Sequence, residues 1–109
     1  MSAPSQPSAS AEALLLKLEG EITIYRAEEI RQALIAALET QRSIALDLSA
    51  VTELDTTGVQ LLLAARRTAQ TRGQALHLTN HSAAVVEVFE TLDIAAQFDD
   101  PILLSAHAA

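Results

Sequence analysis

Apolar and polar residues recur with two different spacings along this chain, and each change of spacing marks a new element. Short apolar runs predict buried strands at residues 13–18, 21–24, 44–48 and 75–79. Apolar positions three and four residues apart predict helices at residues 26–41, 57–72 and 82–92. The first two runs form either two strands or one strand bent at Gly20. This alternation indicates an α/β fold with a largely parallel sheet packed by helices.

The two ends of the chain depart from this pattern. Met1 to Ser10 is rich in Ser, Pro and Ala, and it lacks both the positive segment and the apolar stretch of a signal peptide. We therefore expect a flexible tail at residues 1–11. A single domain at residues 12–104 follows, with a short apolar segment near 94–104, and residues 105–109 form a second tail.

The sharpest break in the pattern lies between the strand at 44–48 and the helix that follows it. Asp55, Thr56 and Thr57 stand at the helix start, where an Asp or Thr oxygen accepts from the unpaired amides of the first turn. Gly58 allows a neighbouring backbone to approach closely. The same geometry presents a hydroxyl beside the positive end of the helix dipole, where a phosphate is well placed.

Charge and composition narrow the possible partners and ligands. The net charge of −7 disfavours nucleic acid and anionic lipid, and it suits a basic protein partner. The chain has no cysteine, which excludes a disulfide framework and a thiolate zinc site. Its longest apolar stretches are far shorter than the roughly 20 residues that span a bilayer. We expect a cytoplasmic protein with no metal, no cofactor and no direct membrane insertion.

Common catalytic motifs are missing from the sequence. It has no Gly-rich phosphate loop, no Gly-x-Ser-x-Gly turn and no His-x-x-x-His pair. His77, His81 and His107 are scattered, and we expect them to be ordinary surface residues, with His77 pointing to solvent. Ser82 is expected to cap the third helix, with Val85, Val86, Phe89 and Leu92 facing inward. The sequence therefore predicts a protein that is not an enzyme.

Two short motifs flank the break at the helix start. They read Asp47-Leu48-Ser49 and, after a short spacer, Asp55-Thr56-Thr57-Gly58 before an apolar helix. This arrangement resembles the STAS family, the sulfate-transporter and anti-sigma-factor-antagonist domains. The resemblance includes Leu18-Glu19-Gly20-Glu21-Ile22 and covers residues from about Glu12 to Phe98. It implies a STAS-like fold, in which a mixed, largely parallel sheet is packed with alternating helices.

The resemblance also implies a function for the helix start. In anti-sigma-factor antagonists, a cognate serine/threonine kinase phosphorylates the hydroxyl directly after this Asp. The matching residue is Thr56, with Thr57 as the weaker candidate. The implied partner is a serine/threonine kinase or an anti-sigma factor. The residues expected to bind it are Asp55, Thr56, Thr57, Gly58, Thr23 and Tyr25.

Three other residues bear on the resemblance. Thr23 stands where phosphorylated antagonists often carry an acidic residue. Asp47 and Ser49 are expected to be structural, through local bonds between side chain and backbone. The implied function is a non-catalytic module whose binding to a signalling partner is switched by phosphorylation.

Other interpretations of the same residues stay open. Asp55, Thr56 and Thr57 can cap a helix with no regulatory use. The chain can also be an unphosphorylated STAS subunit of a lipid-transport ABC system, in which Thr56 contacts the partner unmodified. A third possibility is a STAS partner in a chemotaxis-type sensory system. The sequence leaves the partner and the oligomeric state open.

Overall fold

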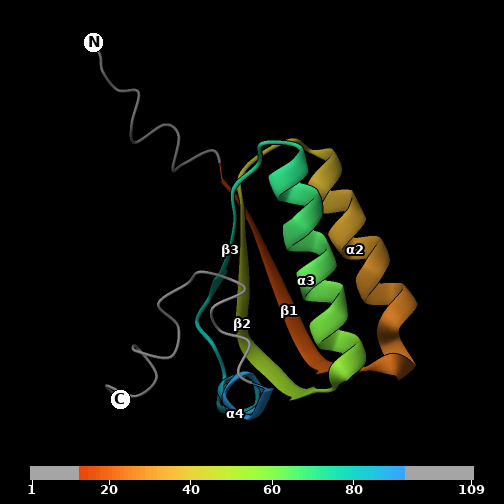
Figure 1. Ribbon diagram of the computed structural model, residues 1–109, viewed down its shortest axis with the longest axis vertical. Coiled ribbons are helices and arrows are strands. Elements are labelled where there is room, and N and C mark those ends of the chain that lie inside the picture. Colours follow the sequence, from red (N-terminus) through yellow and green to blue (C-terminus); the bar gives the residue numbers. More distant parts are fainter. Residues whose placement is uncertain (1–12, 93–109) are drawn as a thin grey trace.

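Strands and helices alternate along the chain as the spacing predicts (Figure 1). The computed structural model describes residues 13–92 of the 109-residue chain. The sheet has three parallel strands in the order β1-β2-β3, namely β1 (Leu14–Ile22), β2 (Ile44–Leu54) and β3 (Leu76–Thr79). The helices are η1 (Ile24–Arg26), α2 (Ala27–Glu39), α3 (Thr56–Thr71) and α4 (Ala83–Leu92). The predicted α/β fold with a largely parallel sheet is confirmed.

The core lies mainly between the sheet and the two helices α2 and α3, which lie side by side on one face of it (Figure 1). Its strand residues are aliphatic and buried: Leu18, Ile22, Ile44, Leu46, Leu48, Leu76 and Leu78. From α4, which packs against β2, Val85 and Phe89 are fully buried. Each such side chain contributes roughly 1.5–3 kcal/mol of burial free energy, before the entropy of ordering it is subtracted.

β1 is one strand that bends, as the second of the two predicted alternatives had it. Its register against β2 shifts twice, and Gly20 adopts a positive φ of 77° between the shifts. The guanidinium of Arg26 donates to the backbone carbonyls of Glu19 and Glu21, at 2.6 and 2.7 Å, and pairs with Glu29 at 3.2 Å. Arg26 therefore satisfies the irregular end of β1 and joins it to α2.

Some details of the predicted elements are wrong. β2 does not end at Leu48 but continues to Leu54, because residues expected to form a loop pair with β1 as far as Ile22. Ile24 belongs to the 3-10 helix η1 and not to a strand. Val86 is only partly buried and Leu92 is 43% exposed, so neither faces inward as expected.

Other predicted details agree with the structure. Helices α2, α3 and α4 start and end within two residues of their predicted bounds. The Ser82 hydroxyl accepts from the Val85 amide at 3.3 Å, which confirms the predicted cap of α4. His77 is exposed and His81 is half-buried. The two predicted tails, the apolar segment near 94–104 and His107 lie outside the described residues.

Asp47 and Ser49 lie within β2, close to its first register shift against β1. The Asp47 carboxylate accepts from the Ser49 amide at 2.9 Å, which confirms the local bond expected from the sequence. This bond lowers the pKa of Asp47, with further contributions from the Ser49 hydroxyl, Asn80 and Lys17. The motif thus stabilises the strand at an irregular point.

Gly58, in the first turn of α3, lies directly against β1 and the end of β2. A Cβ atom on Gly58 would stand 2.1 Å from the backbone oxygen of Ile22 and 2.7 Å from Cδ1 of Leu54. A backbone oxygen at that distance cannot move aside without shifting β1. The position therefore requires glycine for space, which agrees with the close approach expected from the sequence.

We expect Gly58→Ala to lower the free energy of unfolding by about 1–3 kcal/mol. The direction of this change is informative, because a Gly-to-Ala substitution inside an unobstructed helix raises the free energy of unfolding by about 1 kcal/mol. Gln60→Ala, at an exposed position of the same helix, is the control and should alter stability by less than about 0.5 kcal/mol. Urea denaturation measures all three proteins, and a stabilised Gly58→Ala would contradict the close packing.

We expect the stability contributed by the Asp47 charge to depend on pH. Because the pKa of Asp47 is lowered in the folded state, the contribution is present above the unfolded value of about 4 and is lost as pH falls through the folded value. Asp47→Asn should thus be less stable than wild type at pH 7, with the difference shrinking below about pH 4. Denaturation at both pH values measures this, with exposed Glu87→Gln as control. A difference independent of pH would contradict it.

Candidate functional site

One carboxylate connects the end of the sheet to two helices. Asp55 follows β2 in an extended conformation, and its Oδ1 accepts from the Gly58 amide at 2.8 Å as the N-cap of α3. Its Oδ2 accepts from the Ile24 amide at 3.0 Å, at the start of η1. The predicted cap is confirmed, and the second bond adds a long-range connection. The starts of α3 and η1 are therefore held together.

Three exposed side chains gather around this carboxylate. Tyr25 is 90% exposed and Ile24 is 61% exposed, both from η1. Thr56, the first residue of α3, is exposed beside the capping Asp55. We call Ile24, Tyr25 and Thr56 the η1–α3 surface. Two adjacent exposed large apolar side chains next to a hydroxyl are typical of a contact surface rather than of ordinary solvent-facing positions.

The residues expected to bind a partner lie at different depths. Tyr25 and Thr56 are on the surface, and Asp55 and Thr57 are half-buried. Thr23 is only 3% exposed, and its hydroxyl forms no hydrogen bond with the described residues. Gly58 is buried against β1. Thr23 and Gly58 thus offer no side-chain atom to a partner in this arrangement. Both are buried beneath the η1–α3 surface.

Two residues of this region are absent from the expected set. The apolar run that ends at Ile24 predicts a strand there, and nothing in the neighbouring sequence indicates that this isoleucine is exposed. Arg26 carries a weak local signal, because Glu29 follows three residues later, at the spacing of helical ion pairs. Its bonds to the carbonyls of β1 depend on the bend of that strand and have no sequence signature.

The charges next to the η1–α3 surface are mostly negative. Glu21 and Glu53 are direct partners in the parallel register of β1 and β2, and both are exposed. Like charges at paired positions disfavour each other. The positive end of the α3 dipole lies at Thr56 and offsets part of this field. A cationic group on a partner would complement Glu21 and Glu53.

The described residues contain no obvious ligand site for a metal. Residues 13–92 hold no group of three or more His, Asp or Glu side chains placed to bind an ion. Within the same range, no helix combines the length and apolar character needed to cross a membrane. At this end of the fold, Thr56 and Tyr25 both carry a hydroxyl on an exposed side chain.

We expect a graded loss of stability at Asp55, since its two oxygens have different partners. Asp55→Ala removes both bonds and should lower the free energy of unfolding by about 1–3 kcal/mol. Asp55→Asn keeps one acceptor oxygen and should lose about half as much. Thermal and urea denaturation of the two variants measure this. Equal losses for Asn and Ala would contradict the role of two separate oxygens.

Comparisons with known proteins agree with this fold. The family model described as "Mlab, STAS domain" matches residues 5–104. The anti-sigma factor antagonist SpoIIAA in its unphosphorylated form is 24% identical with a TM-score of 0.65, over 79% of this chain and 76% of that one. The STAS domain of a SulP transporter from Vibrio cholerae is 22% identical with a TM-score of 0.59, over 89% and 71%.

A third solved structure, of a protein named Mglu, is 27% identical with a TM-score of 0.55. The match covers 62% of this chain but only 17% of Mglu. No curated protein sequence matches. The SpoIIAA and SulP structures support the fold, and the family model covers almost the whole chain. The chain therefore belongs to the STAS domain family.

Proposed function

We propose that this chain is a non-catalytic interaction module whose protein partner binds the η1–α3 surface and is released when Thr56 is phosphorylated. The observation that supports this most is the exposed Thr56 hydroxyl beside two exposed apolar side chains that Asp55 holds in place. A kinase can reach the hydroxyl, and a partner that covers Ile24 and Tyr25 would also cover Thr56. We place the protein in the bacterial cytoplasm.

Charge explains why modification would release the partner. A phosphate adds about −1.5 to −2 charge and must be desolvated if a partner covers it. Its charge would add to the negative charges of Glu21 and Glu53 next to the η1–α3 surface. The positive end of the α3 dipole stabilises an anion at this position, so the fold itself tolerates the phosphate. Release then needs no refolding.

The proposed partner is a serine/threonine kinase or an anti-sigma factor, by analogy with SpoIIAA, which is described as an anti-sigma factor antagonist. In two alternatives, a partner still binds the η1–α3 surface, but phosphorylation of Thr56 does not control the binding. In one, the chain is a constant subunit of a lipid-transport ABC system, and in the other it serves a chemotaxis-type sensory system. Each is an outcome of the following test.

We expect Thr56→Ala to abolish phosphate incorporation in the native cell and to keep most of the partner affinity, because alanine resembles the unmodified state. Thr56→Glu should weaken binding about 10-fold, which corresponds to about 1.4 kcal/mol, with little change in stability. Intact-mass spectrometry and calorimetric titration of the copurified partner measure the two effects. Gln60→Glu, one turn further along α3, controls for added charge.

The opposite result separates the alternatives. A wild-type protein that stays unmodified under signalling conditions, with Ala and Glu variants of equal affinity, would refute the switch and favour a constant subunit. Turnover of a nucleotide or ester that survives repurification and disappears in a point variant would refute the non-catalytic assignment.

A further inference from the structure

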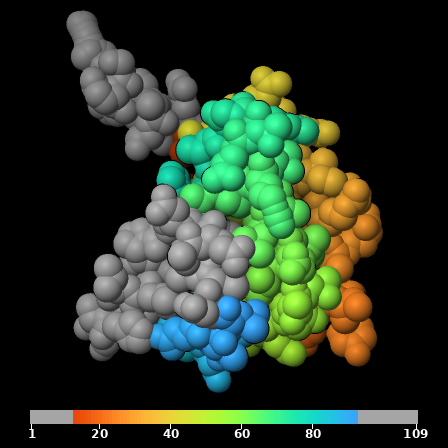
Figure 2. Space-filling model, in the orientation of Figure 1, coloured from red at the N-terminus to blue at the C-terminus, as the bar shows by residue number. Residues whose placement is uncertain are grey.

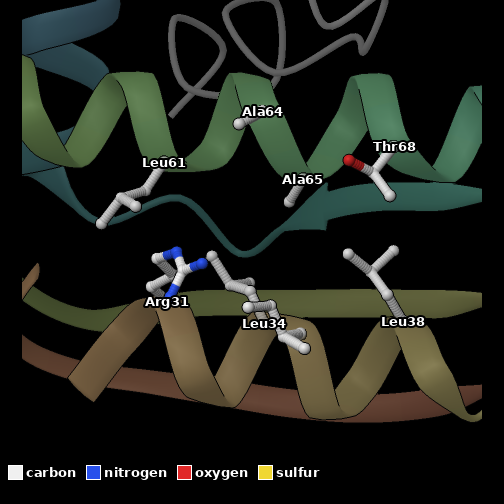
Figure 3. A pocket seen from close by; sticks show the side chains of 8 residues that line it. Arg31, Leu34, Leu38, Leu61, Ala64, Ala65 and Thr68 are labelled. Atoms are coloured by element: carbon white, nitrogen blue, oxygen red, sulfur yellow. The ribbon is translucent and has the colours of Figure 1, made fainter. Parts of the chain in front are cut away.

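The helical face of the sheet offers little surface to another chain. In the space-filling view, the atoms of α3 and α2 border one another over it (Figure 2). Leu34 and Leu38 of α2 and Ala65 of α3 point toward one another between the helices, and all three are buried (Figure 3). The edges of the sheet are different, because backbone groups at an edge can be open to another strand.

β1 forms one edge of the sheet, and part of its outer side is open. The Leu14 amide donates to the Ser43 carbonyl at 2.7 Å, so Leu14 and Leu16 direct their backbone groups toward β2. The N–H and C=O groups of Leu15 and Lys17 alternate with these and point away from the sheet. Among the described residues, no strand pairs with this outer side.

Arginine side chains occupy the carbonyls at both ends of this open stretch. Before it, Nη2 of Arg42 donates to the Ala13 carbonyl at 3.4 Å. After it, Nη1 of Arg26 donates to the carbonyls of Glu19 and Glu21 at 2.6 and 2.7 Å. An added strand would therefore pair mainly with residues 15–17. Such an open edge is a template for another chain unless it is covered.

The residues that precede β1 are poor candidates to cover this edge. A hairpin that returned along Leu15 would use residues close to Pro7, which has no N–H to donate. Residues 8–11 are Ser-Ala-Ser-Ala, without the β-branched or aromatic side chains that favour strands. Leu15 itself is 74% exposed, which is unusual for a large apolar side chain at an open edge. A strand from another chain fits this edge better.

A second copy of β1 fits the open stretch in one register. In an antiparallel pair centred on Leu16, Leu15 lies opposite Lys17 of the second copy, and the reverse. Each of these pairs exchanges two N–H···O bonds, so every open backbone group of Leu15 and Lys17 is used. Centring the pair on Lys17 would oppose two lysines and require the Glu19 carbonyl, which binds Arg26. Centring it on Leu15 would require the carbonyl that binds Arg42.

The charges at this edge permit such a pair, although the chain has a net charge of −7. Residues 13–18 contain no Asp or Glu. Lys17 is the register partner of Asp47 in β2, so its charge is offset within each copy. Repulsion between copies then comes from acidic residues farther from the edge, and salt screens it.

We propose that the β1 edges of two copies pair antiparallel around Leu16 and form a two-fold symmetric dimer. The pair would join the two three-stranded sheets into one. The start of β1 and the η1–α3 surface lie at opposite ends of the sheet (Figure 1). The dimer therefore leaves both η1–α3 surfaces accessible and presents two partner sites at its far ends. This inference goes beyond the proposed function and does not depend on it.

The contact is small, so the dimer is a weak one. Stable interfaces bury about 1,200–2,000 Å² in total, and smaller ones are typical of transient contacts. The pair covers the exposed Leu15 and the half-buried Leu14 and Leu16, together with the backbone of a short strand. We therefore expect a dimer whose population rises with protein concentration.

The first test uses charge at Leu15, which is exposed enough for substitutions to leave the fold intact. Leu15→Glu places a carboxylate opposite Lys17 of the second copy, whereas Leu15→Lys places a like charge there. Leu15→Glu should dimerise at least fivefold more tightly than Leu15→Lys, although it makes the net charge more negative. Analytical ultracentrifugation measures this, and circular dichroism checks folding. Gln60→Glu and Gln60→Lys, on exposed α3, are the controls and should not show this order.

The second test uses the absence of cysteine from the chain, which gives each variant a single thiol. In the proposed register the Cα atoms of the two Leu16 residues are about 4.5 Å apart, which a disulfide can bridge. The two Leu14 residues are about 14 Å apart along the strands. With oxidised glutathione, Leu16→Cys should form a covalent dimer on non-reducing electrophoresis. Leu14→Cys, also half-buried in β1, should not.

The results that would overturn the inference are distinct. A wild-type protein that stays monomeric at every concentration would refute the dimer, and hydrogen exchange at the Leu15 and Lys17 amides would then show whether another segment of the same chain covers the edge. Equal crosslinking of Leu14→Cys and Leu16→Cys would refute the register, as would equal dimerisation of Leu15→Glu and Leu15→Lys. None of these results bears on Thr56, so this inference and the proposed function fail separately.

Discussion

The two hydrogen bonds accepted by the Asp55 carboxylate hold together the end of the fold where β2, η1 and α3 meet. Its two oxygens accept from two amides, one in the first turn of α3 and one 31 residues earlier in the chain. Each amide would otherwise lack a partner, at a cost of about 1–3 kcal/mol if buried. A single side chain therefore fixes the distance between Thr56 and the exposed pair Ile24 and Tyr25.

Two further constraints make that arrangement rigid. Gly58 places the first turn of α3 directly against the backbone of β1, and Arg26 joins the bent end of β1 to α2. Because both constraints hold the backbone of β1, the η1–α3 surface is formed by the chain alone. A preformed surface loses less conformational entropy on binding than one that must order itself. Tyr25 adds large contact area with few rotatable bonds.

At this end of the fold, the sequence predicts only those features that depend on residues close together in the chain. The Asp55 cap, the exposed Thr56 and the close approach at Gly58 follow from side-chain types at successive positions. The burial of Thr23 and the exposure of Ile24 do not, because a short apolar run looks the same in a strand and in a 3-10 turn. The bond from Asp55 to Ile24 depends on the register of β1 and β2.

The position of Thr56 separates two equilibria that a phosphate can affect. The folding equilibrium would tolerate the added charge, because the positive end of the α3 dipole favours an anion at the helix start. The binding equilibrium does not, because a covered phosphate must lose water close to Glu21 and Glu53. A phosphate in the middle of α3 would affect folding as well. In the function proposed for Thr56, a hydroxyl at the helix start beside exposed apolar side chains would thus let phosphorylation act on binding while the fold stays intact.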